Sequence, residues 1–310
     1  MRYGTRQEYL ALGACLLSLY LLFLPANPLT SPDEEILLRT AVSLIHGNRG
    51  AVPPLPMGFA TKTGIDGREY AQYGLGLPVA AGPFLTAVLA SQGRLGDGFQ
   101  VVAYRPFRLS AAIFNMLVTV CSVLLVRLLL MRLGLSRRAS LAGALMYGVA
   151  TVAWPHGRTF FTEPLAALCI LGAVVLLTQD TAHRPAVLLC AGLLYGWAIL
   201  TRLDSLVAGP GIAWAVAYNT TRPSEMLRRA VLVGIPVVLI LAGIAGYNAY
   251  RFGGVVSTGY EDQTEGVRFS TPLLVGLHGN LLTPGRSLFV YSPVLVLAVP
   301  GIVTLWRTHR

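Results

Sequence analysis

The stretch 109–130 reads LSAAIFNMLVTVCSVLLVRLLL and contains a single charged residue, Arg127. A helix needs about 20 predominantly apolar residues to cross a bilayer, so this stretch predicts a membrane span. Seven further apolar runs lie on either side of it, at 9–26, 139–154, 164–178, 185–200, 205–218, 230–248 and 287–306. We therefore expect one all-α membrane domain over residues 1–310, a polytopic helical bundle of about eight spans.

The composition agrees with this class and excludes others. Of the 310 residues, 54% are hydrophobic and only 12% are charged, and the net charge is +10. The arginines form short clusters between apolar runs instead of one basic stripe, which argues against a nucleic-acid partner. The four cysteines all lie within apolar runs without a CxxC spacing, so they are interpreted as packing residues. The basic N-terminus and the run 9–26 favour a retained signal-anchor helix over a cleaved signal.

The arginine clusters predict the topology, because short loops rich in Arg stay in the cytoplasm. Clusters at 127–138, 184, 222–229 and 307–310 alternate with loops that hold most of the acidic residues. This alternation holds only if the apolar segment 74–93 does not cross, so we expect it to lie in the plane of the outer leaflet. A spanning helix at 74–93 is the alternative. With the in-plane segment, Glu8, Asp180 and Glu225 are inside and the other 11 of the 14 acidic residues are outside.

Two long external loops are predicted, at 27–107 and 249–286. In the first, Ser31 or Thr30 is placed to cap a helix that begins at Pro32 and ends at Gly47. We expect this helix to be amphipathic and to lie on the external face, followed by a loop rich in Pro and Gly. The second external loop carries glycines and aromatic residues and is a candidate to close over a ligand.

The candidate chemistry lies in these loops. Asp33 and Glu34 are the candidate catalytic carboxylates, although acids at a helix N-terminus also serve simply to cap it. Arg158, Arg202 and Arg286 recur at the same expected membrane height, and Arg suits bidentate binding of phosphate. An internal pair of Arg202 with Asp204 is the alternative for that arginine.

A carboxylate facing arginines suits transfer of a sugar from a lipid-linked phosphate. Asp33 would accept the proton of an acceptor hydroxyl while that oxygen attacks the sugar carbon. No cofactor is required by this scheme, because arginines can offset the charge that develops on the phosphate. We expect no metal ligands, and whether a divalent cation takes part stays open.

Six short motifs carry a resemblance to a known family. They are Ser31-Pro-Asp33-Glu34, Tyr73-Gly-Leu-Gly-Leu-Pro78, Arg158-Thr-Phe-Phe-Thr-Glu163-Pro, Leu200-Thr-Arg202, Tyr250-Arg251-Phe252-Gly253, and Thr283-Pro-Gly-Arg286 with Tyr291-Ser-Pro293. In this order the chain resembles the GT-C superfamily of polyprenyl-phosphate-sugar glycosyltransferases, nearest the protein O-mannosyltransferase and aminoarabinose transferase (family 39-like) branch. Relatives often carry Lys-Pro-Pro before the in-plane segment, and this chain lacks it.

The resemblance implies Asp33 as the catalytic carboxylate and a donor pocket that includes Arg158 and Glu163. Tyr73, Arg202, Tyr260 and Arg286 are assigned to donor or substrate binding with them. The expected protein is a multi-pass enzyme of the plasma or inner membrane, active on the extracytoplasmic face. Its expected partners are the lipid-linked donor, membrane lipids, and a glycan, lipid or protein acceptor. A transporter of the lipid-linked sugar and an inactive subunit of the same fold are the alternatives.

Overall fold

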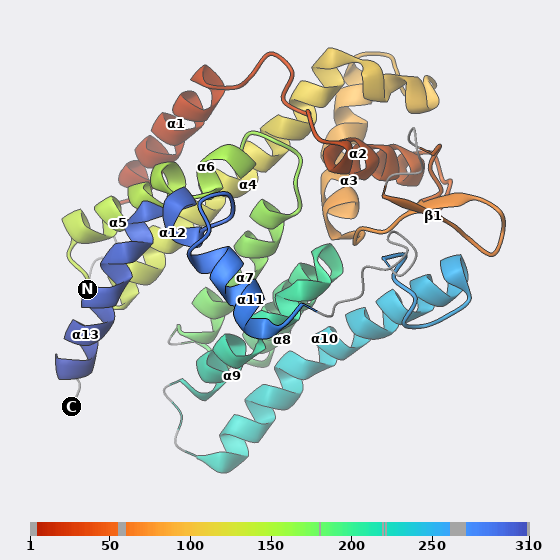
Figure 1. Ribbon diagram of the computed structural model, residues 1–310. Coiled ribbons are helices and arrows are strands. Elements are labelled where there is room, and N and C mark those ends of the chain that lie inside the picture. The colour runs from red at the N-terminus through yellow and green to blue at the C-terminus, as the bar shows by residue number, and fades with distance from the viewer. Residues whose placement is uncertain are drawn as a thin grey trace.

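The computed structural model describes residues 5–54, 60–179, 181–218, 220, 222–260 and 271–308. Helices account for 71% of it and strands for 2%, which confirms the all-α class. Most of the helices run alongside one another in a bundle (Figure 1). They are α1 (Arg6–Leu22), α4 (Arg105–Arg132), α5 (Arg137–Ala150), α7 (Glu163–Leu177), α8 (Pro185–Thr201), α9 (Gly209–Ala217) and α10 (Pro223–Phe252).

Each of these helices coincides with one of the predicted apolar runs. Two of them, α4 and α10, are long and apolar enough to cross a membrane. Helix α10 packs on α8, which in turn packs on α7. Much of the apolar surface of α10 is nevertheless exposed, including the side chains of Val231, Val238 and Leu239. A helix of this composition that leaves most of its apolar surface uncovered calls for an apolar surrounding.

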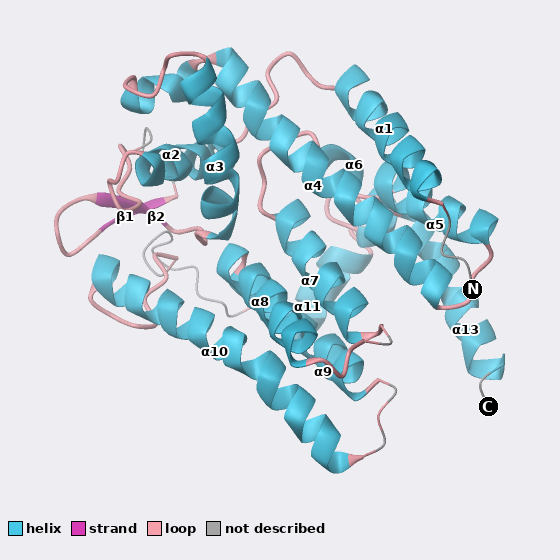
Figure 2. Ribbon diagram, turned by 180° about the vertical axis from the view of Figure 1, so that it is seen from behind, coloured by secondary structure: helices cyan, strands magenta, loops and turns pink. Residues whose placement is uncertain are grey.

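A second group of elements gathers at one end of the bundle, as the two opposite views agree (Figures 1 and 2). These elements are α2 (Pro32–Ile45), β1 (Thr61–Thr63), β2 (Glu69–Ala71), α3 (Gly76–Ser91) and η2 (Gly98–Ala103), a 3-10 helix. Helices α8 and α10 finish at this end and α4 begins there. We call it the hairpin end, after the antiparallel pair β1–β2.

Helix α2 begins as the sequence predicts. The Ser31 hydroxyl accepts a bond from the Asp33 amide, and Pro32 occupies the first turn, where its missing amide hydrogen costs nothing. The burial of this helix extends beyond the one apolar face expected of an amphipathic surface helix. Thr40, Ala41, Val42 and Ser43 are all buried, because α3 and η2 pack against the helix as well as strand β2. Helix α2 is thus largely enclosed by protein, and a narrow polar strip with Glu35 and Arg39 is partly exposed.

The β-hairpin was not predicted, because only a loop rich in Pro and Gly was expected after helix α2. Its turn contains Asp66-Gly67, and Gly67 adopts the positive φ of 75° that such turns require. The Asp66 carboxylate accepts bonds from the Arg68 amide and the Tyr70 hydroxyl, and the latter is the main cause that lowers the pKa of Asp66. An Asp-Gly dipeptide between residues that favour strands was the available signal.

The C-terminal run 287–306 was expected to form one span, but it is not one continuous helix. It is divided into α12 (Leu288–Tyr291), η4 (Pro293–Leu297) and α13 (Ala298–Thr308). Pro293 has no amide hydrogen with which to continue α12, so the helix ends before it. The second predicted external loop also differs, because α10 continues to Phe252 and α11 (Leu273–Leu281) forms within the loop.

The end of the bundle opposite the hairpin is rich in arginine. There Glu8 of α1 pairs with Arg127 of α4 at 2.6 Å and also with Arg137 of α5. Arg228 and Arg229 of α10 both pair with Glu225. Most of the other described acidic residues lie in elements of the hairpin end, and Glu163 and Asp204 lie at the start of α7 and just after α8, so the two ends of the bundle differ in charge.

Candidate functional site

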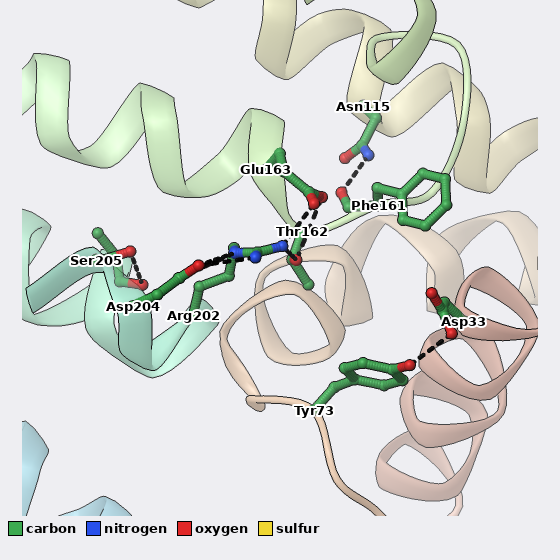
Figure 3. Close-up of polar contacts among 10 residues, drawn as sticks. Asp33, Tyr73, Asn115, Phe161, Thr162, Glu163, Arg202, Asp204 and Ser205 are labelled. Atoms are coloured by element: carbon green, nitrogen blue, oxygen red, sulfur yellow. Dashed lines mark hydrogen bonds and ion pairs between the residues drawn. The ribbon is translucent and has the colours of Figure 1, made fainter. Parts of the chain in front are cut away.

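The candidate site begins with Asp33, in the first turn of α2. Its Oδ1 accepts a 2.5 Å hydrogen bond from the hydroxyl of Tyr73 (Figure 3). Among the described residues no other donor bonds this partly exposed carboxylate, so Oδ2 is left to accept a further proton. Burial, and next the bond to Asp33, raises the pKa of the Tyr73 hydroxyl, which therefore remains a donor at neutral pH.

Tyr73 is held there by the close approach of two segments. Gly74 and Gly76 lie against the backbone of Leu200 and Thr201, at the end of α8, where a Cβ on either glycine would collide. The indole nitrogen of Trp197 donates to the carbonyl of Gly76 at 3.2 Å. The glycines of the Tyr73–Pro78 motif thus place Tyr73 beside the C-terminus of α8, where Arg202 follows.

Arg202 lies between two carboxylates (Figure 3). Its Nη1 is 2.5 Å from Oε1 of Glu163, the first residue of α7, and its Nη2 is 2.8 Å from Oδ2 of Asp204. The hydrogen bond between Arg202 and Asp204 raises the pKa of Arg202 and lowers that of Asp204. The pair proposed from the sequence is therefore present, and Glu163 joins it.

Tyr260 connects the Arg202 group with the Asp33 group. Its ring meets that of Tyr73 edge to face, with 6.3 Å between centroids. Although Tyr260 is 44% exposed, partial desolvation is the main cause that raises the pKa of its hydroxyl, and the charges of Arg202, Asp204, Asp33 and Glu163 also act on it. The structure therefore brings together five predicted site residues, which are Asp33, Tyr73, Glu163, Arg202 and Tyr260.

Glu34 has different surroundings from Asp33, although the two are adjacent. Its side chain is fully buried. Oε2 accepts from the amides of Thr30 and Ser31, and Oε1 accepts from the amide of Phe160 at 2.9 Å. With both oxygens occupied by backbone donors, Glu34 joins the start of α2 to the loop that precedes α7, and this geometry favours a structural part for it.

Arg158 was expected to face Asp33, but its guanidinium points elsewhere. Its Nη1 donates to the carbonyl of Phe23 at 2.6 Å, its Nε donates to the carbonyl of Trp154, and its guanidinium stacks on the Trp154 ring. Burial lowers the pKa of Arg158. Arg158 contacts Phe23 because the short helix α6 (Ala153–His156) turns its loop back toward the end of α1.

Arg286 also lies apart from Asp33. It lines an open, mostly apolar hollow of about 320 Å³ with Val152 and with residues of α11 and α12. The sequence placed three arginines at one height along the membrane normal, but it could not tell which side of the bundle each would occupy.

One polar residue of this region was missed. Asn115 is fully buried in the middle of the apolar face of α4, and its Nδ2 donates to the carbonyl of Phe161 at 2.7 Å (Figure 3). This bond holds the loop that carries Thr162 and Glu163. The isolated Asn within the run 109–130 was the signal for it, because a buried amide in such a run needs a partner.

Within the described residues no group of three or more His, Cys, Asp or Glu side chains is arranged to hold a metal ion. The chain was compared with known proteins in three ways. No family model, no curated protein and no solved structure matched it.

Proposed function

We propose that this chain is a polytopic membrane glycosyltransferase that transfers a sugar from a polyprenyl-phosphate donor to an acceptor hydroxyl. The observation that carries the proposal is the Asp33 carboxylate, partly exposed and held through one oxygen by Tyr73. It lies beside a second group of charged residues, at the end of an apolar bundle. A general base must reach the proton that it abstracts, and the free Oδ2 of Asp33 is available for this while Tyr73 orients the carboxylate.

A membrane setting accounts for the exposed apolar helices. About eight spans, formed by the helices of the bundle with the C-terminal segment, would place α10 against lipid. The arginine-rich end would face the cytoplasm, because short basic loops are retained there. The hairpin end, with the site, would then be extracytoplasmic.

The course of α3 supports this topology. Gly76 at its start contacts the end of α8, and η2, which follows α3, leads directly into the start of α4. Both ends of α3 therefore lie at the hairpin end of the bundle. This is the geometry expected of an in-plane helix at 74–93, and it leaves the order of the other spans unchanged.

In the proposed reaction the acceptor O–H gives its proton to Asp33 while its oxygen bonds to the anomeric carbon. The bond from that carbon to the phosphate oxygen breaks, and the lipid phosphate leaves with the electron pair. Attack from the face opposite the leaving group inverts the anomeric configuration. Glu34 is assigned to holding α2, so we assign the role of base to Asp33 alone.

We assign different roles to the arginines of the site. Arg202 already faces two acids, so we assign it to fixing Glu163 and Asp204 beside Tyr260. Arg158 remains the candidate for the donor phosphate, since it is not paired with a carboxylate among the described residues and its loop reaches Glu34, next to Asp33, through the Phe160 amide. Nη2 of Arg158 has no described hydrogen-bond acceptor and is available to an anion.

The proposal is tested with purified protein and radiolabelled polyprenyl-phosphate mannose, glucose or arabinose. We expect a new glycosidic product with one of these donors, and a loss of about a hundredfold or more in Asp33→Asn. Asp97→Asn, which removes an exposed pair with Arg94, is the matched control and should retain activity. Movement of the labelled lipid across vesicles without a glycosidic product would instead favour a transporter, and absence of both would favour a subunit without catalysis.

A further inference from the structure

Arg251, in the last turn of α10, is a buried charge with an unusual set of partners. Its side chain is 5% exposed. No carboxylate pairs with it in the part of the chain that the structure describes. Its guanidinium stacks on the rings of Tyr247 and Phe252, at 4.2 and 4.6 Å from their centroids. Burying a cation costs free energy unless hydrogen bonds and aromatic faces compensate it, so the burial of Arg251 calls for a structural explanation.

The reason lies in the β-hairpin, which Arg251 contacts twice. Its Nη1 donates to the carbonyl of Ala71, the last residue of β2, at 2.6 Å. Its own carbonyl accepts from the amide of Ile65 in the hairpin turn at 2.8 Å. The Asn248 side chain orients the guanidinium through a 2.8 Å bond from Nη2. One residue therefore fastens the turn and the second strand of the hairpin to the end of α10.

A glycine makes this attachment possible. A Cβ on Gly64 would lie 2.7 Å from the carbonyl oxygen of Arg251 and 2.7 Å from the ring of Tyr70. Neither neighbour can retreat easily, because one is backbone and the other is a fully buried ring. The hairpin is thus shaped to lie directly against the end of α10.

The hairpin leads to the candidate site within two residues. After Ala71 the chain continues through Gln72 to Tyr73, whose hydroxyl bonds Asp33. On the other side of Arg251, the chain passes Gly253 and reaches Tyr260, whose ring packs against Tyr73. Tyr73, which bonds Asp33, and Tyr260, which packs on Tyr73, are therefore both connected along the chain to this attachment.

We propose that Arg251 is a positioning residue that holds Tyr73 on Asp33 by fixing the end of β2. The inference rests on the proposed function, because positioning matters only if Asp33 acts on a substrate. Arg is required in place of Lys, since only the planar fork reaches Ala71 and Asn248 together while stacking on two rings.

Three variants test the inference: Arg251→Lys, Arg251→Met and, as the matched control, Arg228→Met. Arg228 is on the same helix, at the opposite end of the bundle, in an exposed pair with Glu225. The first readout is hydrogen–deuterium exchange at the amides of Gly64, Ile65 and Gln72. Loss of the anchor should speed exchange there by about tenfold or more in both Arg251 variants, and not in the control. Unchanged exchange would overturn the inference.

The second readout is transfer kinetics in a double-mutant cycle with Tyr73→Phe. Arg251→Lys should lower kcat by about tenfold with little change in donor KM, and should add less than about threefold once Tyr73 is Phe. Fully additive effects, or a change in KM alone, would contradict a positioning role. If the wild-type protein transfers no sugar, the proposed function fails, while the exchange rates still decide whether Arg251 holds the segment before Tyr73.

Discussion

The hydroxyl of Tyr73 lies 2.5 Å from Oδ1 of Asp33, although 40 residues separate them in the chain. Asp33 is placed by the capping of α2, and Tyr73 is placed by the hairpin and by two glycines against α8. Their contact therefore depends on α2, the hairpin and α8, which are distant from one another in the sequence. It fixes one oxygen of the carboxylate and leaves the other available.

Replacement of Tyr73 by Phe should weaken catalysis without unfolding the protein. A hydrogen bond to a charged group contributes about 1.5–3 kcal/mol, so we expect kcat to fall by about 10- to 100-fold. Initial-rate kinetics with the labelled donor would measure this, with Tyr218→Phe at the opposite end as the control. A Tyr73→Phe enzyme with wild-type kcat would show that this bond has no part in the reaction.

Glu34→Gln should act mainly on stability. The amide keeps only one acceptor oxygen for three backbone donors, and the buried loss should cost roughly 2 kcal/mol or more in free energy of unfolding. Glu35→Gln, which weakens a partly exposed pair with Arg39 and a longer 4.0 Å contact with Arg108, should cost less than about 1 kcal/mol. Thermal unfolding in detergent compares the two. A Glu34→Gln protein that is fully stable and yet inactive would restore a catalytic role for Glu34.

Two glycines of α3 offer a matched pair for the contact with α8. A Cβ at Gly76 would collide with Thr201, whereas a Cβ at Gly82 meets nothing within 4 Å. Gly76→Ala should therefore lower the unfolding temperature and the activity together. Gly82→Ala should be neutral, or stabilising by up to about 1 kcal/mol, because Ala favours a helix. Equal unfolding temperatures for the two variants would refute the close approach.

The pairing of Arg202 with Asp204 predicts a pH dependence of stability. The pKa of Asp204 is lowered in the folded state, so the pair contributes fully above the unfolded aspartate pKa of about 3.9 and is lost as the pH falls through the lower folded value. Asp204→Asn should lower the unfolding temperature by a few degrees at most at pH 7. This difference should shrink toward zero in acid, and a difference that grows in acid would contradict the assignment.

The orientation of the bundle can be measured by labelling single cysteines in a protein whose four native cysteines are replaced. Ser136→Cys lies at the start of α5, at the arginine-rich end, and Arg68→Cys lies in the hairpin turn. An impermeant thiol reagent applied to intact cells or spheroplasts should label Arg68→Cys and leave Ser136→Cys unmodified. The reverse pattern would invert the proposed topology.

Much of the fold follows from local sequence. The apolar runs predicted the helices of the bundle, and Ser31-Pro32 predicted the start of α2, because capping and hydrophobic length are properties of short segments. The enclosure of α2 was not predictable, since it depends on how α3 and η2 return over it. The hairpin was not predicted, although the Asp66-Gly67 dipeptide indicates its turn.

The candidate site was predictable in part. Arg202 with Asp204 is a local pair, two residues apart, and it was anticipated. The contact of Glu163 with Arg202 and that of Tyr73 with Asp33 join distant segments, and only their membership of one external face was expected. Arg158 and Arg286 were misplaced because height along the membrane normal does not specify the direction around the bundle.

The measurement that tests the central claim most directly is transfer of radiolabelled sugar from a polyprenyl phosphate by the purified wild-type protein, Asp33→Asn and Asp97→Asn, compared at equal amounts of folded protein. The proposal predicts a glycosidic product that the wild-type and Asp97→Asn proteins form at similar rates and that Asp33→Asn forms about a hundredfold more slowly or not at all. A product formed by Asp33→Asn at the wild-type rate would contradict the assignment of Asp33 as the base.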